Sequence, residues 1–134
     1  MKKNRQGFTL VEIMIVVAII ALLAVIAIPN LMRARVSAND ALAQSTLRTL
    51  ATAVQNFAAD NNGTFPADLG VLATATPPYT NVNYATNATQ SGFTYAYVAA
   101  TNTITATPAT CGTTGSRVFT INTQSAAITA VVCS

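Results

Sequence analysis

The feature that most constrains this chain is an almost unbroken apolar run near its start. The run extends from Phe8 to Ile28, and only Thr9 and Glu12 interrupt it. As a helix that rises ~1.5 Å per residue, such a run spans the ~30 Å hydrocarbon core of a bilayer. We therefore expect a membrane-spanning helix. Glu12 should need a partner there, because a carboxylate inside an apolar span costs ~2.5–3.5 kcal/mol at mid-membrane and less near an end.

Basic residues directly precede the apolar run. Lys2, Lys3 and Arg5 account for the whole formal net charge of +3, and the side chains from Phe8 onward are balanced. The positive-inside rule places residues 1–7 in the cytoplasm and the C-terminal part of the chain outside. Because no cluster of cations remains after the leader, we expect no binding of nucleic acid.

Small residues at the end of the run also fit a different interpretation. Ala24, Ala27 and Pro29 lie where a secretory signal would be cleaved to release a soluble protein. That interpretation leaves Glu12 unexplained, and the chain after Pro29 continues as a helix without a linker. We favour a retained helix that kinks or locally unwinds at Pro29, because proline lacks an N–H and strains the preceding turn.

Residues 30–62 have the pattern of an amphipathic helix that needs a cover on one side. Asp60 to Gly63 provides a stop, since glycine suits a left-handed cap. A core face for the C-terminal domain is the interpretation that we favour over a groove for a partner. The expected apolar stripe consists of Val36, Ala43, Leu47, Leu50, Val54 and Phe57.

The second half of the chain changes to a period of two from Gly92 onward, which indicates strands. Before that point we expect a short helical turn over 66–72 and a loop over 74–91. The short connections favour an antiparallel sheet, one face of which buries the helix stripe. The expected strands are one that carries Phe93, Tyr95 and Tyr97 on one face, and then 103–107, 117–122 and 128–133.

These elements define an α+β fold in which a long N-terminal helix packs against a small antiparallel sheet. The length of the chain leaves room for one head domain beyond the apolar run. The expected divisions are a leader at 1–7, a transmembrane helix at 8–29, an amphipathic helix at 30–62 and a globular head at 63–134.

The motif Gly7-Phe8-Thr9-Leu10-Val11-Glu12, after a short basic leader and before an apolar run that ends in Pro29, resembles the N-terminus of type IV pilins and of type II secretion pseudopilins. The resemblance covers about the first third of the chain. It implies the type IV pilin fold, cleavage after Gly7 by a prepilin peptidase and N-methylation of the new terminus at Phe8. It also implies that Glu12 acts in assembly.

The chemistry of the motif agrees with this resemblance. Cleavage after Gly7 creates an amine at Phe8, and Glu12 lies four residues later on the same face of a helix. The carboxylate can neutralise its own amine or that of a neighbouring subunit, and the helix dipole also favours it. The alternative is a glutamate that is merely tolerated at the interface.

Cys111 and Cys133 are the only cysteines, and we expect them to form a disulfide. The compartment outside the inner membrane permits this bond, and the family resemblance supports it, because many pilins close their C-terminal region with such a bridge. The alternatives are two free thiols or a metal site, for which no histidine or further cysteine completes the ligands. We expect no metal and no cofactor.

Three classes of function remain for comparison. The chain lacks the residues that acid–base catalysis by an enzyme needs, because it has no histidine and no acidic side chain after Asp68. A membrane-tethered binding module does not require Glu12 or the leader. The scarcity of carboxylates and the cysteine pair favour a surface pilin over a pseudopilin, because the resemblance associates major pseudopilins with calcium.

The preferred function is thus a structural subunit of a type IV pilus. The resemblance implies a homopolymeric helical filament, a prepilin peptidase, an assembly platform and a motor ATPase as partners. The subunit is expected in the inner membrane, with its C-terminus outside, and then in the surface filament. Motility, adhesion, DNA uptake and electron transfer all remain open as roles.

Overall fold

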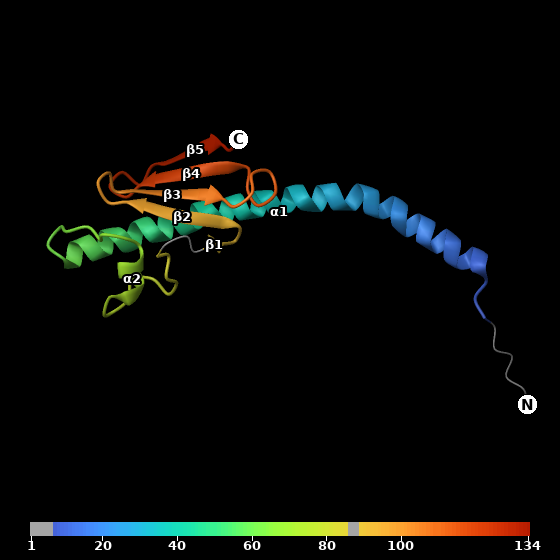
Figure 1. The fold of residues 1–134 in the computed structure, drawn as a ribbon, viewed down its shortest axis with the longest axis horizontal. Coiled ribbons are helices and arrows are strands. Elements are labelled where there is room, and N and C mark those ends of the chain that lie inside the picture. The colour runs from blue at the N-terminus through green and yellow to red at the C-terminus, as the bar shows by residue number, and fades with distance from the viewer. Residues whose placement is uncertain (1–6, 86–88) are drawn as a thin grey trace, which may run out of the picture. The chain divides into compact units, whose positions relative to one another are not determined.

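The computed structural model describes residues 7–85 and 89–134. Most of the expected leader, residues 1–6, therefore lies outside the described residues. The chain divides into two compact units, Met1–Ala34 and Arg35–Ser134, and a single helix, α1 (Leu10–Asp60), contributes to both. Figure 1 shows the elements in chain order. Each unit is considered by itself.

In the first unit, α1 carries apolar side chains that nothing in the described chain covers. Phe8 is 87% exposed, and the large apolar residues that follow it as far as Met32 are exposed as well. By length and composition this helix could cross a membrane. Water alone is a poor environment for such a surface, so the segment needs lipid or other protein around it.

The helix continues through Pro29 without a break. Next to the proline, the Asn30 Nδ2 donates a hydrogen bond to the Ile26 carbonyl at 3.1 Å. The local unwinding expected at Pro29 is absent from this structure, and a kink there in other surroundings stays a prediction.

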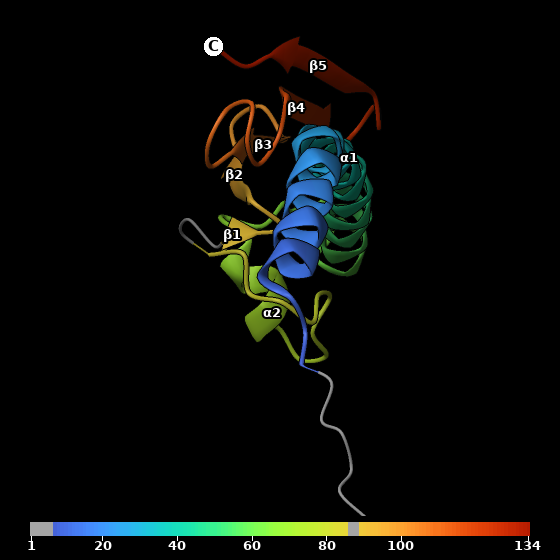
Figure 2. The same cartoon turned by 90° about the vertical axis from the view of Figure 1, so that its right-hand side faces the viewer.

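The second unit combines the rest of α1 with an antiparallel sheet in the order β1-β2-β3-β4-β5. The sheet lies along one side of the helix in this unit (Figures 1 and 2). Consecutive strands pair with their neighbours throughout, so the topology is a simple meander. This confirms the expected α+β architecture. The strands are β1 (Thr89–Gln90), β2 (Phe93–Val98), β3 (Thr103–Pro108), β4 (Arg117–Asn122) and β5 (Ile128–Val132).

The core of this unit forms between the apolar stripe of α1 and the inner face of the sheet. The residues that alternate along each strand are buried, as the period of two predicted. Phe93 and Phe119 meet at a ring-centroid distance of 6.1 Å across the sheet. The predicted stripe is confirmed at its centre, whereas Val36 and Phe57 at its two ends are only partly buried. The buried core comprises Ala43, Leu47, Leu50, Ala51, Ala53, Val54, Leu69, Leu72, Tyr84, Phe93, Tyr95, Ile104, Ala106, Phe119 and Ile121.

The end of α1 follows the sequence signal. The helix stops at Asp60, and Gly63 has a φ of 83°. The Gly63 N–H donates to the Ala58 carbonyl at 2.7 Å and so satisfies one of the last free carbonyls of the helix.

The short helix after α1 differs from the expected turn over 66–72. It is α2 (Gly70–Thr74), so it begins and ends later than predicted. The physical reason is Asp68, whose Oδ1 accepts hydrogen bonds from the N–H groups of Gly70 at 2.6 Å and Val71 at 3.1 Å. The aspartate therefore caps the helix from before its start instead of lying inside its first turn.

The strand β1 was not predicted, because it lies in the segment expected to be a loop. It has two residues and therefore no periodicity of its own. The signal that could have revealed it is the turn Ser91-Gly92, in which both residues have positive φ values, 52° and 78°. Such two-residue turns match the twist of a β-hairpin.

The loop between β3 and β4 is attached to α1 through polar contacts. Asp40 accepts hydrogen bonds from the Ser116 N–H at 3.0 Å and from the Ser116 hydroxyl, and the Asn39 Nδ2 donates to the Thr114 carbonyl at 2.8 Å. At Gly115 an added Cβ would come within 2.3 Å of the Phe93 ring, so only glycine fits there. Cys111 of this loop is joined by a disulfide to Cys133, after β5.

Two leucines of α1 allow a matched test of the core. Leu47 is fully buried, whereas Leu42 is 51% exposed. We expect Leu47→Ala to lower the free energy of unfolding of the head by about 2–5 kcal/mol, because it removes buried methyl groups and leaves a cavity. Leu42→Ala should change it by less than about 1 kcal/mol. Denaturation of the full chain in detergent, followed by near-ultraviolet circular dichroism of the tyrosines, measures both. Equal effects would contradict this core.

The Tyr95 side chain, 3% exposed, has a hydroxyl without a hydrogen-bond partner in the described part of the chain. Burial raises the pKa of this hydroxyl, and the neighbouring Thr46 hydroxyl counters the shift without meeting hydrogen-bond geometry. The folded state therefore favours the protonated form. Its contribution is fully present below the ordinary tyrosine pKa of about 10 and is lost as pH rises through the higher pKa of the folded state.

We expect Tyr95→Phe to leave the stability of the head unchanged or to raise it by up to about 1 kcal/mol at neutral pH, because an unpaired buried hydroxyl is removed. Above about pH 10 the variant should lose less stability than the unaltered chain. Tyr84→Phe is the matched control, since it deletes the hydrogen bond from the Tyr84 hydroxyl to Gln90 and should destabilise the head at neutral pH. Urea unfolding at both pH values tests this. A Tyr95→Phe variant that is less stable than Tyr84→Phe would contradict the argument.

Candidate functional site

Three of the residues singled out by the sequence, Gly7, Phe8 and Glu12, lie together where α1 begins. Gly7 and Phe8 precede the helix, and both are exposed. A Cβ added at Gly7 would find nothing within 4 Å. The peptide bond between these residues is therefore open to approach in the described part of the chain.

Thr9 and Glu12 hold the first turn of α1 together through reciprocal hydrogen bonds. The Thr9 N–H and the Thr9 hydroxyl both donate to the Glu12 Oε2 at 2.8 Å, and the Glu12 N–H donates to the Thr9 Oγ1 at 3.2 Å. The first N–H groups of a helix have no partner within the helix itself, and this capping box satisfies two of them. The box explains why the helix begins at Leu10.

The capping role of Glu12 was not predicted from the sequence, for which we considered only pairing with an amine, the helix dipole and mere tolerance. The signal was present, because a threonine followed three residues later by a glutamate before an apolar run is a capping-box pattern. Thus Glu12 already has polar partners within its own chain. The need for a partner inside an apolar span is met in part before any assembly or cleavage.

The other candidate residues are separate from this cluster in the sequence. Pro29 lies inside α1, and the disulfide between Cys111 and Cys133 belongs to the second unit. Among residues 7–85 and 89–134, no group of three or more histidine, cysteine, aspartate or glutamate side chains could hold a metal ion. The cluster from Gly7 to Glu12 is therefore the candidate site.

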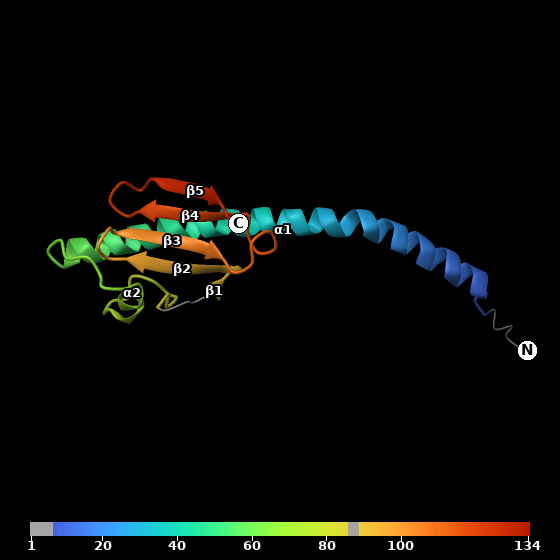
Figure 3. The same cartoon turned by 45° about the horizontal axis from the view of Figure 1, so that its top comes forward.

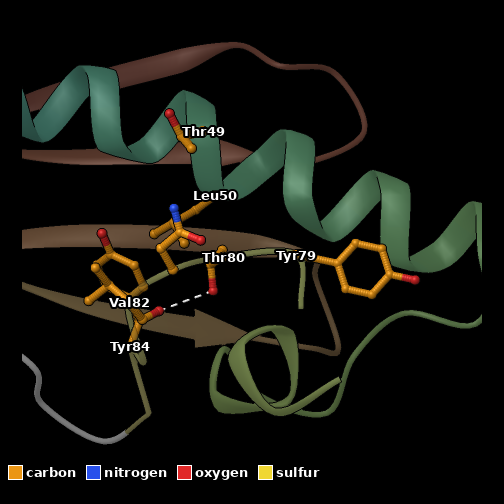
Figure 4. Close-up of a pocket in the computed structure, with 7 residues that line it drawn as sticks. Thr49, Leu50, Tyr79, Thr80, Val82 and Tyr84 are labelled. Carbon is orange, nitrogen blue, oxygen red and sulfur yellow. Dashed lines mark hydrogen bonds between the residues drawn. The ribbon is translucent and has the colours of Figure 1, made fainter. Parts of the chain in front are cut away.

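A hollow of about 250 Å³ lies between α1 and the segment after α2, and Figure 4 shows the residues that line it. Most of its polar side chains are used by the fold. The Thr80 hydroxyl donates to the Val82 carbonyl at 3.0 Å, and the Tyr79 hydroxyl donates to Asp60 at 2.7 Å. The hydrogen bond to Asp60 raises the pKa of Tyr79. The hollow thus fixes the loop on the helix and holds no set of groups suited to catalysis. Its lining is Thr49, Leu50, Tyr79, Thr80, Asn81, Val82 and Tyr84.

Comparison with known proteins identifies the N-terminal segment. Residues 2–28 match the family model described as the prokaryotic N-terminal methylation motif. This match covers residues 2–7 of the expected leader, the candidate site and the apolar run up to the residue before Pro29. The resemblance inferred from the residues is thereby confirmed.

Curated relatives fall into two groups. The chain is 45% identical over 60 residues to the type IV wide pilus major component PilA4 of Thermus thermophilus, a match that covers 45% of this chain and 46% of the relative. It is 46% identical over 54 residues to the type IV major pilin protein PilA of Myxococcus xanthus, covering 40% of this chain and 24% of the relative. It is 37% identical over 79 residues to the type II secretion system core protein G of Aeromonas hydrophila, covering 58% and 55%.

The chain spans about half the length, or less, of these curated relatives. No solved structure matches it. The similarity and the observed architecture of a long apolar helix with an antiparallel sheet nevertheless agree with each other. The chain therefore carries the prokaryotic N-terminal methylation motif over residues 2–28 and is related in sequence to type IV major pilins and to the core protein G of type II secretion systems.

Proposed function

We propose that this chain is the precursor of a type IV pilin, a structural subunit that polymerises into a surface filament through its N-terminal helix. The observation that carries the proposal is the uncovered apolar length of α1, which begins at a methylation motif with Glu12 in its first turn. Such a surface suits two environments in succession, the membrane and the inside of a filament. Its relatives among the type IV major pilins support this function over a simple membrane tether.

The first step in this proposal is cleavage after Gly7 by a prepilin peptidase. Hydrolysis of the bond between Gly7 and Phe8 releases residues 1–7 and leaves an amine on Phe8, which is then N-methylated. The leader carries three cations that favour the cytoplasm. Its removal therefore eliminates the charge that opposes extraction of the helix from the membrane. The new cation lies next to Thr9, whose N–H donates to the Glu12 carboxylate.

The second step is assembly, in which Glu12 pairs with an N-terminal amine. The carboxylate has two oxygens and accepts several hydrogen bonds, so it can keep the Thr9 contacts while it receives a charged donor. The amine of the same chain and the amine of a neighbouring copy are both candidates. Pairing in an apolar environment strongly favours the charged pair over an isolated carboxylate.

The apolar length of α1 then packs against other copies of itself. Ala18, Ala21, Ala24 and Ala27 recur every three residues and wind around the helix, which suits several neighbours rather than one dimer partner. The proposed partners are further copies, the prepilin peptidase, an assembly platform and its motor ATPase. The subunit resides in the inner membrane with its C-terminal head outside until it enters the filament.

A pseudopilin of a type II secretion system is the second candidate, and the relatives named core protein G favour it, with matches over up to 60% of this chain. Against it stands the sheet domain, in which no acidic side chain follows Asp68 to supply ligands for calcium. The cellular phenotype separates the two candidates. A pseudopilin is needed for protein secretion, whereas a pilin is needed for surface filaments.

The proposal is tested by electron microscopy of filaments sheared from cells with and without this gene. We expect thin filaments to disappear when the gene is deleted and to return when it is restored. Filaments should contain the chain without residues 1–7, as mass spectrometry of the sheared material would show. Loss of secretion with filaments unaffected would instead identify a pseudopilin.

The charge and the capping role of Glu12 can be separated by two substitutions. Glu12→Gln keeps an oxygen that accepts the Thr9 N–H, as the capping box allows, but removes the charge. Thr9→Ala removes the hydroxyl contacts, at about 1 kcal/mol of helix stability, but keeps the charge. If pairing with an amine drives assembly, Glu12→Gln and Glu12→Leu should abolish filaments, and Thr9→Ala should retain them.

The membrane fraction supplies the control for this experiment, because both glutamate variants should insert as well as the unaltered chain. Normal filaments from Glu12→Gln would show that the charge is not required. Loss of filaments in Thr9→Ala alone would show that capping is the essential role.

A further inference from the structure

The strand β5 forms one edge of the sheet, and Figures 1 and 3 show it as the outermost strand. It pairs with β4 on one side, and no strand in the ranges 7–85 and 89–134 pairs with its other side. Such an edge presents unpaired N–H and C=O groups that can bind another strand.

The hydrogen bonds around β4 and β5 show which residues face this edge. The Cys133 N–H donates to the Ser116 carbonyl at 3.3 Å, and the Asn122 N–H donates to the Ala127 carbonyl at 3.4 Å. In an antiparallel pair, residues that bond the neighbouring strand alternate with residues that do not. Thr129 and Val131 therefore bond β4, whereas the backbone groups of Ile128, Ala130 and Val132 point toward the open edge.

Nothing in the sequence of β5 protects this edge. The strand has no charged residue and no proline, which are common devices that prevent pairing between edges. Val131 is 68% exposed and Val132 is 74% exposed, although they lie on opposite faces of the strand. The other edge of the sheet, in contrast, ends in the two-residue strand β1.

We infer that β5 binds β5 of a second copy of this chain, antiparallel and centred on Ala130. In this register, Ile128 faces Val132 of the partner copy at both ends, and Ala130 faces Ala130. All three are the residues whose backbone groups point outward, so each of these groups finds a partner. A shift of the register by two residues leaves outward groups unpaired at the ends, so the strand is complementary to itself in one register.

The side chains and charges agree with this occupant. In a contact with two-fold symmetry, a residue near the axis meets its own copy, so a charged residue there would repel itself. Ala130 at the axis is small, exposed and uncharged. On the outer face Thr129 lies opposite Val131 of the partner copy, a pair that fits a pleated surface.

The contact is small, and this determines where it acts. A strand pair of five residues buries much less than the ~1,200–2,000 Å² of a stable interface, so an isolated pair binds weakly. Many such contacts that act together bind far more tightly. In filaments of the kind proposed above, β5 would therefore join filaments side by side. This role between filaments rests on the proposed function, whereas the contact between two chains is independent of it.

The test uses the full chain, purified in detergent, and sedimentation at increasing protein concentration. The unaltered chain should form dimers at high concentration. Ala130→Lys and Ala130→Glu should each require at least about tenfold more protein for the same dimer fraction, because like charges then meet at the axis. An equal mixture of the two variants should dimerise again, because opposite charges meet. Ala96→Lys, on an exposed alanine of β2, is the matched control and should leave dimerisation unchanged.

These substitutions leave the bonds between β4 and β5 intact, because the Ala130 backbone faces away from β4. Near-ultraviolet circular dichroism checks that the head is folded. The same mass for all variants, or a mixture that stays monomeric, would overturn the inference, and neither result depends on whether filaments form.

A second pair of variants guards against misfolding of the first. The double variant Thr129→Glu with Val131→Lys places opposite charges across the proposed register, on exposed positions of the outer face. It should dimerise more strongly than Val131→Lys alone, and added salt should remove the difference. A double variant that is no stronger than the single one would show that this register is wrong.

Discussion

Apolar surface on α1 that the chain itself leaves uncovered is the constraint on which the rest of this protein depends. From Phe8 to Met32 the large apolar side chains are exposed, whereas from Ala43 to Ala58 the sheet covers one face of the same helix. Burial of apolar area is worth about 25 cal/mol per Å², so an exposed run of this length carries a large driving force for partition or association. The head is thus complete as a folded unit, and the first unit becomes complete only with lipid or other copies around it.

The capping box lowers the free-energy cost of the polar groups at the start of the apolar part of α1. Helix N-terminal N–H groups and a lone carboxylate are both costly in an apolar environment. The Thr9–Glu12 contacts satisfy two of these N–H groups and give the carboxylate two hydrogen-bond donors. Pairing with an amine can therefore complete an arrangement that is already partly satisfied. In the assembly step proposed above, a cation would replace water or lipid around the carboxylate, without first exposing a bare charge.

Much of the fold could be predicted from the sequence, because its main elements are long and strongly patterned. The apolar run, the stripe around Leu47 and Leu50, and the alternation along the strands each repeat several times, so tertiary contacts do not override them. The errors occurred where the signal is short. Asp68 shifted α2 by capping it from outside, and β1 is too short to show a period.

The candidate site was predicted from a motif, but its geometry was not. The segment from Phe8 to Glu12 supports a capping box, through Thr9 three residues before Glu12, and a salt bridge with a new N-terminus at Phe8 four residues before it. Periodicity alone does not distinguish the two. Contacts between distant segments were also beyond the reach of pattern reasoning. The attachment of Ser116 to Asp40 joins residues that are 76 positions apart, and no local preference encodes that meeting.

The two uncovered features of this chain differ in strength, and in the proposed filament this difference would separate two levels of organisation. Side chains along the first part of α1 present a long apolar surface. The strand β5, in contrast, has five residues and presents mainly backbone N–H and C=O groups at its open edge. Hydrophobic burial along a helix gives a long-lived contact. A short strand pair dissociates readily unless many such pairs act together. A filament built on the helix can therefore be stable by itself, and association between filaments through β5 can be reversible without weakening the filament.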